Sequence, residues 1–125
     1  MSTLLDRINT ALRDIPYPSK PEGLYEPIRY VLSMGGKRLR PTLLLLAHGL
    51  YSENTDEAVS AAIGLETYHN HTLLHDDLMD HADMRRGQLT VHKKWNENTA
   101  VLSGDTMLIL AFQLIMQCGC RREAD

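Results

Sequence analysis

Residues 57–80 read EAVSAAIGLETYHNHTLLHDDLMD, without proline and with a single glycine, Gly64. Apolar residues in this stretch cluster at positions 58, 59, 62, 63, 65, 73, 74, 78 and 79. Apolar positions three and four residues apart favour a helix over strands. Asn54 and Thr55, just before the stretch, offer an N-cap. The sequence therefore predicts one long helix over residues 57–80.

The remaining segments also read as helices. Apolar spacing predicts helices over residues 3–13, 22–34, 41–50 and 99–118, and prolines separate the first two. Residues 81–90 read as a loop, and no segment reads as a strand. The predicted fold class is all-α.

The predicted helix over 99–118 is apolar nearly all round, which is typical of a buried helix. It runs close to Asp125, so further helices are expected to cover it. We therefore interpret residues 1–125 as the amino-terminal portion of a single, larger helical domain.

Composition argues against several classes of protein. The net charge of −3 disfavours a general nucleic-acid binder, which would show a basic excess. Apolar runs such as Leu43–Ala47 and Met107–Phe112 are far shorter than the ~20 residues of a membrane span. Cys118 and Cys120 are the only cysteines, and no cysteine or histidine follows them to complete a zinc site. We expect a soluble, cytoplasmic protein with reduced thiols.

Three carboxylates, Asp76, Asp77 and Asp80, lie at the end of the long helix. Like charges one turn apart destabilise a helix by about 0.2–0.5 kcal/mol per pair, so a cation usually neutralises them. Oxygen ligands suit Mg²⁺, which completes its shell with water and substrate phosphates. Arg85 and Arg86 follow closely and would hold those phosphates. The cluster is typical of a site for a magnesium-bridged diphosphate.

A second basic cluster follows the glycine pair 35–36 and consists of Lys37, Arg38 and Arg40. His69 lies seven residues before Asp76, on the same stripe of the predicted helix. Two small basic clusters around an acidic one suit a small anionic substrate.

Together these motifs resemble the amino-terminal part of the trans-isoprenyl diphosphate synthases, the polyprenyl synthetase family. The resemblance covers roughly residues 24–112 and rests on GGKRLRP at 35–41, His69, DDLMD at 76–80 and RRG at 85–87. It implies an isoprenoid-synthase-type helical bundle, a Mg²⁺ cofactor and a homodimer. The implied enzyme is a prenyltransferase of isoprenoid biosynthesis that condenses an allylic diphosphate with isopentenyl diphosphate.

The resemblance also implies roles for single residues. Asp76 and Asp80 would be the magnesium ligands, with Asp77 supporting or joining them. Arg85 would contact the allylic diphosphate. The diphosphate of isopentenyl diphosphate would be held by Lys37, Arg40 and Arg86 with help from His69, and Arg38 is counted with these substrate-binding candidates. In the implied reaction the diphosphate leaves the allylic substrate, the double bond of isopentenyl diphosphate attacks the resulting allylic cation, and a proton is lost.

One departure from the family pattern bears on activity. Full-length members carry a second aspartate-rich motif on a later helix, whereas only Asp105 and Asp125 follow Asp83 here. The 125-residue chain is therefore expected to be inactive by itself.

Product length depends on residues before the first aspartate motif. In the family a bulky aromatic residue there plugs the growing-chain tunnel, but this sequence has His71 and Thr72. Tyr68, about one turn earlier, could form a floor. These positions favour a farnesyl or geranylgeranyl product.

Two alternatives remain open. The chain could be a diphosphate-binding or regulatory half without turnover. Five of the six histidines lie between residues 69 and 92, and His75-Asp76 also resembles a metal-dependent phosphohydrolase. That second alternative needs imidazole ligands and a transition metal, and it explains neither basic cluster.

Overall fold

The computed structural model describes residues 2–17, 22–51 and 56–117. Over these residues the elements are α1 (Ser2–Arg13), α2 (Glu22–Ser33), α3 (Leu39–His48), α4 (Asp56–Met79), β1 (Met84–Arg85), β2 (Gln88–Leu89), α5 (Val91–Lys94) and α6 (Glu97–Met116). The all-α prediction is confirmed, and α4 matches the long predicted helix to within one residue at each end.

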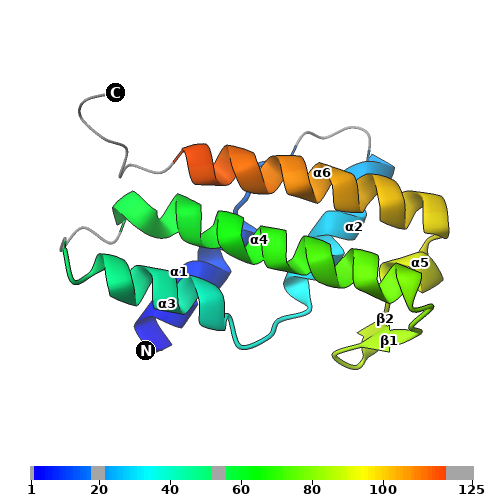
Figure 1. Ribbon diagram of the computed structural model, residues 1–125, viewed down its shortest axis with the longest axis horizontal. Helices are drawn as coiled ribbons and strands as arrows, with labels where there is room; N and C mark the ends of the chain where they lie inside the picture. Colours follow the sequence, from blue (N-terminus) through cyan, green and yellow to red (C-terminus); the bar gives the residue numbers. More distant parts are fainter. Residues whose placement is uncertain (1, 18–21, 52–55, 118–125) are drawn as a thin grey trace.

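The two longest helices, α4 and α6, lie side by side in opposite directions (Figure 1). α1 and α3 pack against α4, while α2 packs mainly against α6. The core between these helices includes Ile8, Leu12, Ile28, Leu32, Leu45, Ala62, Leu74 and Met107. Burial of each large aliphatic side chain contributes about 1.5–3 kcal/mol, so helix packing supplies most of the stability.

Two glycines allow α4 and α6 to approach closely. A Cβ atom at Gly64 would lie 2.8 Å from Ile115 Cγ1 and 2.9 Å from the Ala111 carbonyl oxygen. A Cβ atom at Gly104 would collide with the His75 ring. Larger residues at either position would therefore push the two helices apart.

A short hairpin interrupts the segment predicted as a loop. β1 and β2 pair in antiparallel register, and the turn residues Arg86 and Gly87 have φ of 52° and 78°. Positive φ at both positions is typical of a type I′ turn. Each strand has only two residues, too few for an alternating apolar pattern to mark it in the sequence. The prediction that no segment forms a strand was wrong here.

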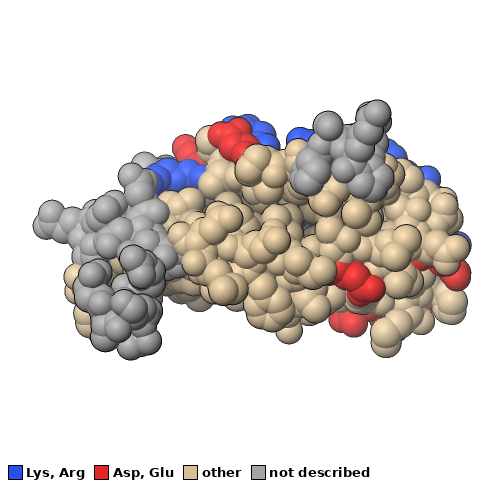
Figure 2. Space-filling view, turned by 90° about the horizontal axis from the view of Figure 1, so that it is seen from above, with Lys and Arg blue, Asp and Glu red and all other residues tan. Residues whose placement is uncertain are grey.

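α6 is buried on one side only, which corrects the expectation of a fully buried helix. Its exposed apolar side chains are Val101, Leu102, Ile109, Phe112, Ile115 and Met116. Figure 2 looks down on this side, which carries no Lys, Arg, Asp or Glu over most of its area. By length and composition alone α6 could cross a membrane, but the core helix of a soluble protein can have the same length and composition.

Candidate active site

The acidic cluster splits into two exposed carboxylates and one buried carboxylate. Asp76 and Asp80 are exposed, and neither takes part in an ion pair within the described residues. Asp77 is buried, with its Oδ2 accepting from Arg85 Nε at 2.6 Å and its Oδ1 from Arg85 Nη2 at 2.9 Å. These hydrogen bonds to Asp77 raise the pKa of Arg85. Asp77 therefore anchors Arg85, and of the three carboxylates only Asp76 and Asp80 face solvent.

The hairpin turn sends the next arginine in another direction. Arg86 Nη1 donates to the Gly35 carbonyl oxygen at 2.6 Å and to Asn70 Oδ1 at 3.3 Å. A Cβ atom at Gly36 would lie 3.0 Å from Arg86 Cζ, and Gly36 has a φ of 123°. Gly36 thus leaves room for the guanidinium against the loop.

These contacts close a basic pocket of about 410 Å³. It is lined by Gly36, Lys37, Arg38, Leu39, Arg40, Glu66, His69 and Arg86. The structure thus brings the loop before α3, the middle of α4 and the hairpin turn to one place. Its four basic residues outnumber its one acid, so the pocket fits an anion.

His69 lies in this pocket as a hydrogen-bond acceptor. Its Nε2 is 3.2 Å from Arg40 Nη1, and a guanidinium can only donate. Burial lowers the pKa of His69 below its usual value, and the charge of Arg40 lowers it further. His69 is therefore neutral at physiological pH and orients Arg40 by accepting a hydrogen bond from its guanidinium.

Arg38 differs from the other predicted substrate contacts because its guanidinium points into the core. Its φ is 52°, in the left-handed region, and only 4% of the residue is exposed. It donates to Glu66 Oε2 at 2.7 Å, to Asn9 Oδ1 at 3.1 Å and to the Leu32 carbonyl oxygen at 2.5 Å. These bonds tie α1, α2 and α4 together. A substrate-binding role for Arg38 stays a prediction, and its geometry favours a structural one.

Two polar residues of α4 that the sequence analysis missed connect the arginines. Glu66 Oε2 accepts from Asn70 Nδ2 at 3.0 Å as well as from Arg38. Asn70 is 1% exposed and holds Arg86 through its Oδ1. The sequence did contain a signal for these two residues. Glu66 and Asn70 are polar, lie four residues apart and stand among apolar positions of α4, and buried polar groups need hydrogen-bond partners.

The exposed carboxylates suit a metal that shares its ligands with a substrate. No three His, Cys, Asp or Glu side chains in the described parts of the chain could hold a metal ion together. Mg²⁺ commonly takes one or two carboxylates and completes its shell with water and phosphate, so Asp76 and Asp80 fit it. His69 lies seven residues before Asp76, which places the basic pocket about 10 Å along α4.

The remaining histidines of α4 pack toward α6. His71 Nδ1 lies 2.8 Å from the Gly104 carbonyl oxygen, and His75 Nε2 lies 3.8 Å from Asp105 Oδ1. The rings of Tyr68 and His71 are 5.8 Å apart. His71 and His75 therefore contact α6, and the described residues offer no group of three His, Cys, Asp or Glu side chains for the transition metal that a phosphohydrolase needs.

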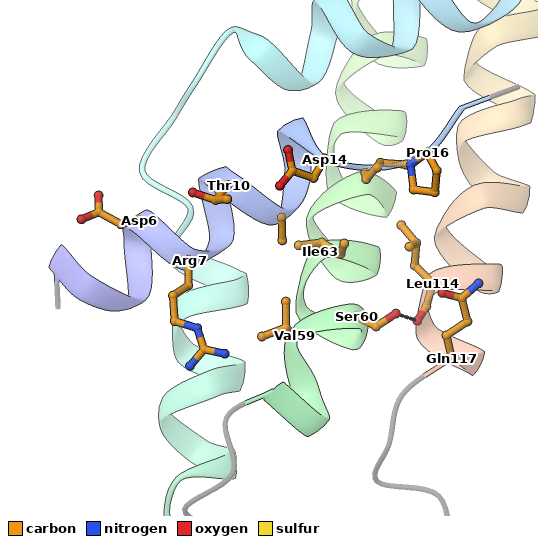
Figure 3. A pocket seen from close by; sticks show the side chains of 12 residues that line it. Asp6, Arg7, Thr10, Asp14, Pro16, Val59, Ser60, Ile63, Leu114 and Gln117 are labelled. Atoms are coloured by element: carbon orange, nitrogen blue, oxygen red, sulfur yellow. Dashed lines mark hydrogen bonds between the residues drawn. The ribbon is translucent and has the colours of Figure 1, made fainter. Parts of the chain in front are cut away.

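A larger cavity of about 690 Å³ lies near the start of α4, between α1 and the end of α6 (Figure 3). No predicted site residue lines it. Apolar side chains of Val59, Ile63 and Leu114 contribute to its wall, while Asp6 and Asp14 are its acidic lining residues. With one lining arginine against two aspartates, this cavity does not match a diphosphate.

Comparison with known proteins identifies the family. The polyprenyl synthetase family model matches residues 21–124. A geranylgeranyl pyrophosphate synthase from Geoglobus acetivorans is 44% identical over 86% of this chain and 34% of its own length. A farnesyl diphosphate synthase from Micrococcus luteus is 44% identical over 90% of this chain and 39% of its own length.

Solved structures agree with the sequences. The heptaprenyl diphosphate synthase from Staphylococcus aureus has a TM-score of 0.85 and 35% identity, over 93% of this chain and 37% of that protein. The chain thus spans about a third of the length of the relatives it matches. The sequence resemblance is confirmed, and the chain belongs to the polyprenyl synthetase family.

Proposed function

We propose that the chain contributes one wall of a trans-prenyltransferase active site, where an allylic diphosphate condenses with isopentenyl diphosphate. The observation that carries this proposal is the basic pocket beside α4. Its lysine and arginines surround a neutral histidine about two helical turns from the exposed carboxylates of Asp76 and Asp80.

The basic pocket would bind the diphosphate of isopentenyl diphosphate. Lys37, Arg40 and Arg86 supply three cations, and charge-assisted hydrogen bonds to phosphate are among the strongest in proteins. His69 fixes the Arg40 guanidinium by accepting from it. Asn70 fixes Arg86 in the same way, so both groups are oriented before the substrate arrives.

The acidic end of α4 would bind the allylic diphosphate. Asp76 and Asp80 would hold Mg²⁺, which when bound neutralises the charge of the departing diphosphate. Asp77 keeps Arg85 beside these carboxylates, and Arg85 would contact the same diphosphate. In the reaction the C–O bond of the allylic diphosphate breaks and a C–C bond to isopentenyl diphosphate forms. A proton is then lost from the new product.

A farnesyl or geranylgeranyl product is part of the proposal. Relatives named as farnesyl and geranylgeranyl synthases support it. Tyr68 is 43% exposed beside His71, where its ring would limit the growing chain. Chromatography of the product from a complete enzyme would test this, and a forty-carbon product would contradict it.

A second candidate function is diphosphate binding without turnover. The chain spans about a third of its relatives' length, and the described residues contain one aspartate-rich cluster. In this case the chain would bind both diphosphates but form no product by itself.

Titration with geranyl diphosphate, with and without magnesium, tests the acidic end. We expect magnesium to strengthen binding about tenfold or more and Asp76→Asn/Asp80→Asn to abolish this gain. Asp83→Asn is the matched control, because its exposed carboxylate pairs with Lys93 instead. If the affinity for geranyl diphosphate changed neither with magnesium nor in the double variant, the proposal would be contradicted.

Product formation separates the two candidate functions. The same protein is incubated with geranyl diphosphate, isopentenyl diphosphate and magnesium, and products are separated by chromatography. Binding without product supports the non-catalytic function, whereas product from the 125-residue chain shows the expectation of inactivity to be wrong.

The proposal includes a cytoplasmic homodimer. The exposed apolar side chains of α6 support an interaction surface, since contiguous apolar patches on soluble proteins commonly mark interfaces. Sedimentation of the wild-type chain and of Phe112→Glu would test it, and a monomer in both would contradict a dimer through this helix.

A further inference from the structure

A second basic cavity, of about 560 Å³, lies between α1 and α2. Its lining includes Arg13, Arg29 and Arg38 and no aspartate or glutamate. Arg38 lines both this cavity and the active-site pocket, whereas Gly35 lines only this cavity and Lys37 and Arg40 line only the latter. The two cavities can therefore be tested by different variants.

Two of the three arginines in this cavity remain available to an anion. Glu66 balances the charge of Arg38 in a buried pair. Within the described ranges, Arg13 donates only to the hydroxyl of Thr10, at 3.2 Å. Arg29 pairs with Glu26 at 3.4 Å, but both side chains are more than half exposed, and such pairs are weak. The cavity thus presents about two positive charges without a strong competing acid.

Tyr17 contributes a donor that lacks a partner. Its hydroxyl oxygen is enclosed and makes no hydrogen bond to any residue that the structure describes. Leaving such a group unsatisfied is unfavourable, because it has lost its hydrogen bonds to water without replacement. Burial raises the pKa of Tyr17 to about 12, so the hydroxyl stays protonated at neutral pH. An acceptor placed in the cavity would satisfy it.

We propose that this cavity binds a phosphate monoester of a small apolar alcohol. The phosphate would accept from Arg13, Arg29 and the Tyr17 hydroxyl. Its two negative charges match the two available arginines, whereas a diphosphate would exceed them. The apolar group would lie on Leu12 and Leu32, which line the same cavity.

Calorimetric titration with 1-naphthyl phosphate at pH 7.5 tests the proposal on the full chain. We expect saturable binding at one site. Tyr17→Phe and Arg13→Gln should each weaken it about 3–10-fold, the effect of one lost hydrogen bond to a charged group. Arg40→Gln, in the other pocket, should change it by less than about twofold.

Two further ligands establish the class of molecule. Inorganic phosphate and 1-naphthol should each bind at least about tenfold more weakly, because each lacks half of the contacts. Equal binding of inorganic phosphate would overturn the ester in favour of a simple anion site. If 1-naphthol bound as tightly as 1-naphthyl phosphate, the phosphate would not contribute to binding, and the proposed role of the arginines would be wrong.

Other outcomes would place the ligand elsewhere or nowhere. Loss of binding in Arg40→Gln but not in Tyr17→Phe would put the ligand in the active-site pocket, and absence of saturable binding would also overturn the proposal. Thermal unfolding checks that the variants fold. Tyr17→Phe removes an unsatisfied hydroxyl and keeps the ring, so its stability should not fall.

Discussion

Two loops deliver basic side chains to the basic pocket: the loop before α3, residues 35–38, and the hairpin turn between β1 and β2. In each loop a residue in the left-handed region turns neighbouring charges in different directions. The difference is burial. The Arg38–Glu66 pair is only 3% exposed on each side, whereas in the Arg85–Asp77 pair the exposed fractions are 32% and 10%.

This difference in burial distinguishes basic side chains that hold the fold together from those that are free to bind a ligand. The inward Arg38 holds its loop against α1, α2 and α4, which leaves Lys37 and Arg40 to face the basic pocket. In the Arg85–Asp77 pair the arginine is partly exposed, and its carboxylate partner belongs to the acidic cluster. Loss of the inward Arg38 should therefore affect folding most, and loss of Arg85 in the hairpin should affect it less.

The largest effect is expected from Arg38→Met. It leaves Glu66 buried without its cation, which should lower the free energy of unfolding by about 3–5 kcal/mol. Lys37→Met, at the exposed neighbour, should change it by less than about 0.5 kcal/mol. Urea denaturation measures both values. If both variants lowered the free energy of unfolding by a similar small amount, the inward Arg38 would not differ from the outward Lys37 in its effect on stability.

The glycine pair offers a finer test of the first loop. Gly36→Ala should lower stability by about 1–3 kcal/mol because of its positive φ, as should Gly35→Ala. Only the methyl group at position 36 would press on Arg86, so only Gly36→Ala should also weaken isopentenyl diphosphate binding, by about tenfold. Equal affinities in the two variants would mean that Gly36 does not position Arg86.

A smaller loss is expected in the hairpin. Arg85→Gln removes two hydrogen bonds to Asp77 but leaves a carboxylate that water can reach, so the loss should be about 1–2 kcal/mol. Lys93→Gln, which breaks an exposed pair with Asp83, should cost at most about 0.5 kcal/mol. If Arg85→Gln destabilises as much as Arg38→Met, burial does not distinguish the loops.

The sequence predicted the helices better than it predicted the direction of single side chains. Apolar spacing in a long, proline-free stretch located α4, because a helix repeats its pattern over many turns. Arg38 was grouped with its neighbours, since nothing in GGKRLRP indicates that a non-glycine residue adopts a left-handed φ. Likewise, composition described α6 as apolar but could not tell which side the bundle covers.

The smallest effect is a pH dependence at His69, to which both loops contribute. Burial and the charges of Arg40 and Arg86 lower its pKa from 6.5. Its contribution to stability is therefore present above pH 6.5 and is lost as the pH falls through the lowered pKa, because the unfolded state takes up the proton first. His69→Gln should flatten the unfolding free energy below pH 6.5. If the unfolding free energy of His69→Gln changed with pH as steeply as that of the wild type, His69 would not be the group responsible.

Calorimetric titration of isopentenyl diphosphate most directly tests whether the two loops form one diphosphate pocket. We expect Arg40→Gln and Arg86→Gln each to weaken binding about tenfold or more, although Arg40 lies at the start of α3 and Arg86 in the hairpin turn. Arg85→Gln should leave the affinity within about twofold, because Arg85 is engaged by Asp77. Binding that survives either pocket variant, or that falls equally in Arg85→Gln, would contradict the pocket.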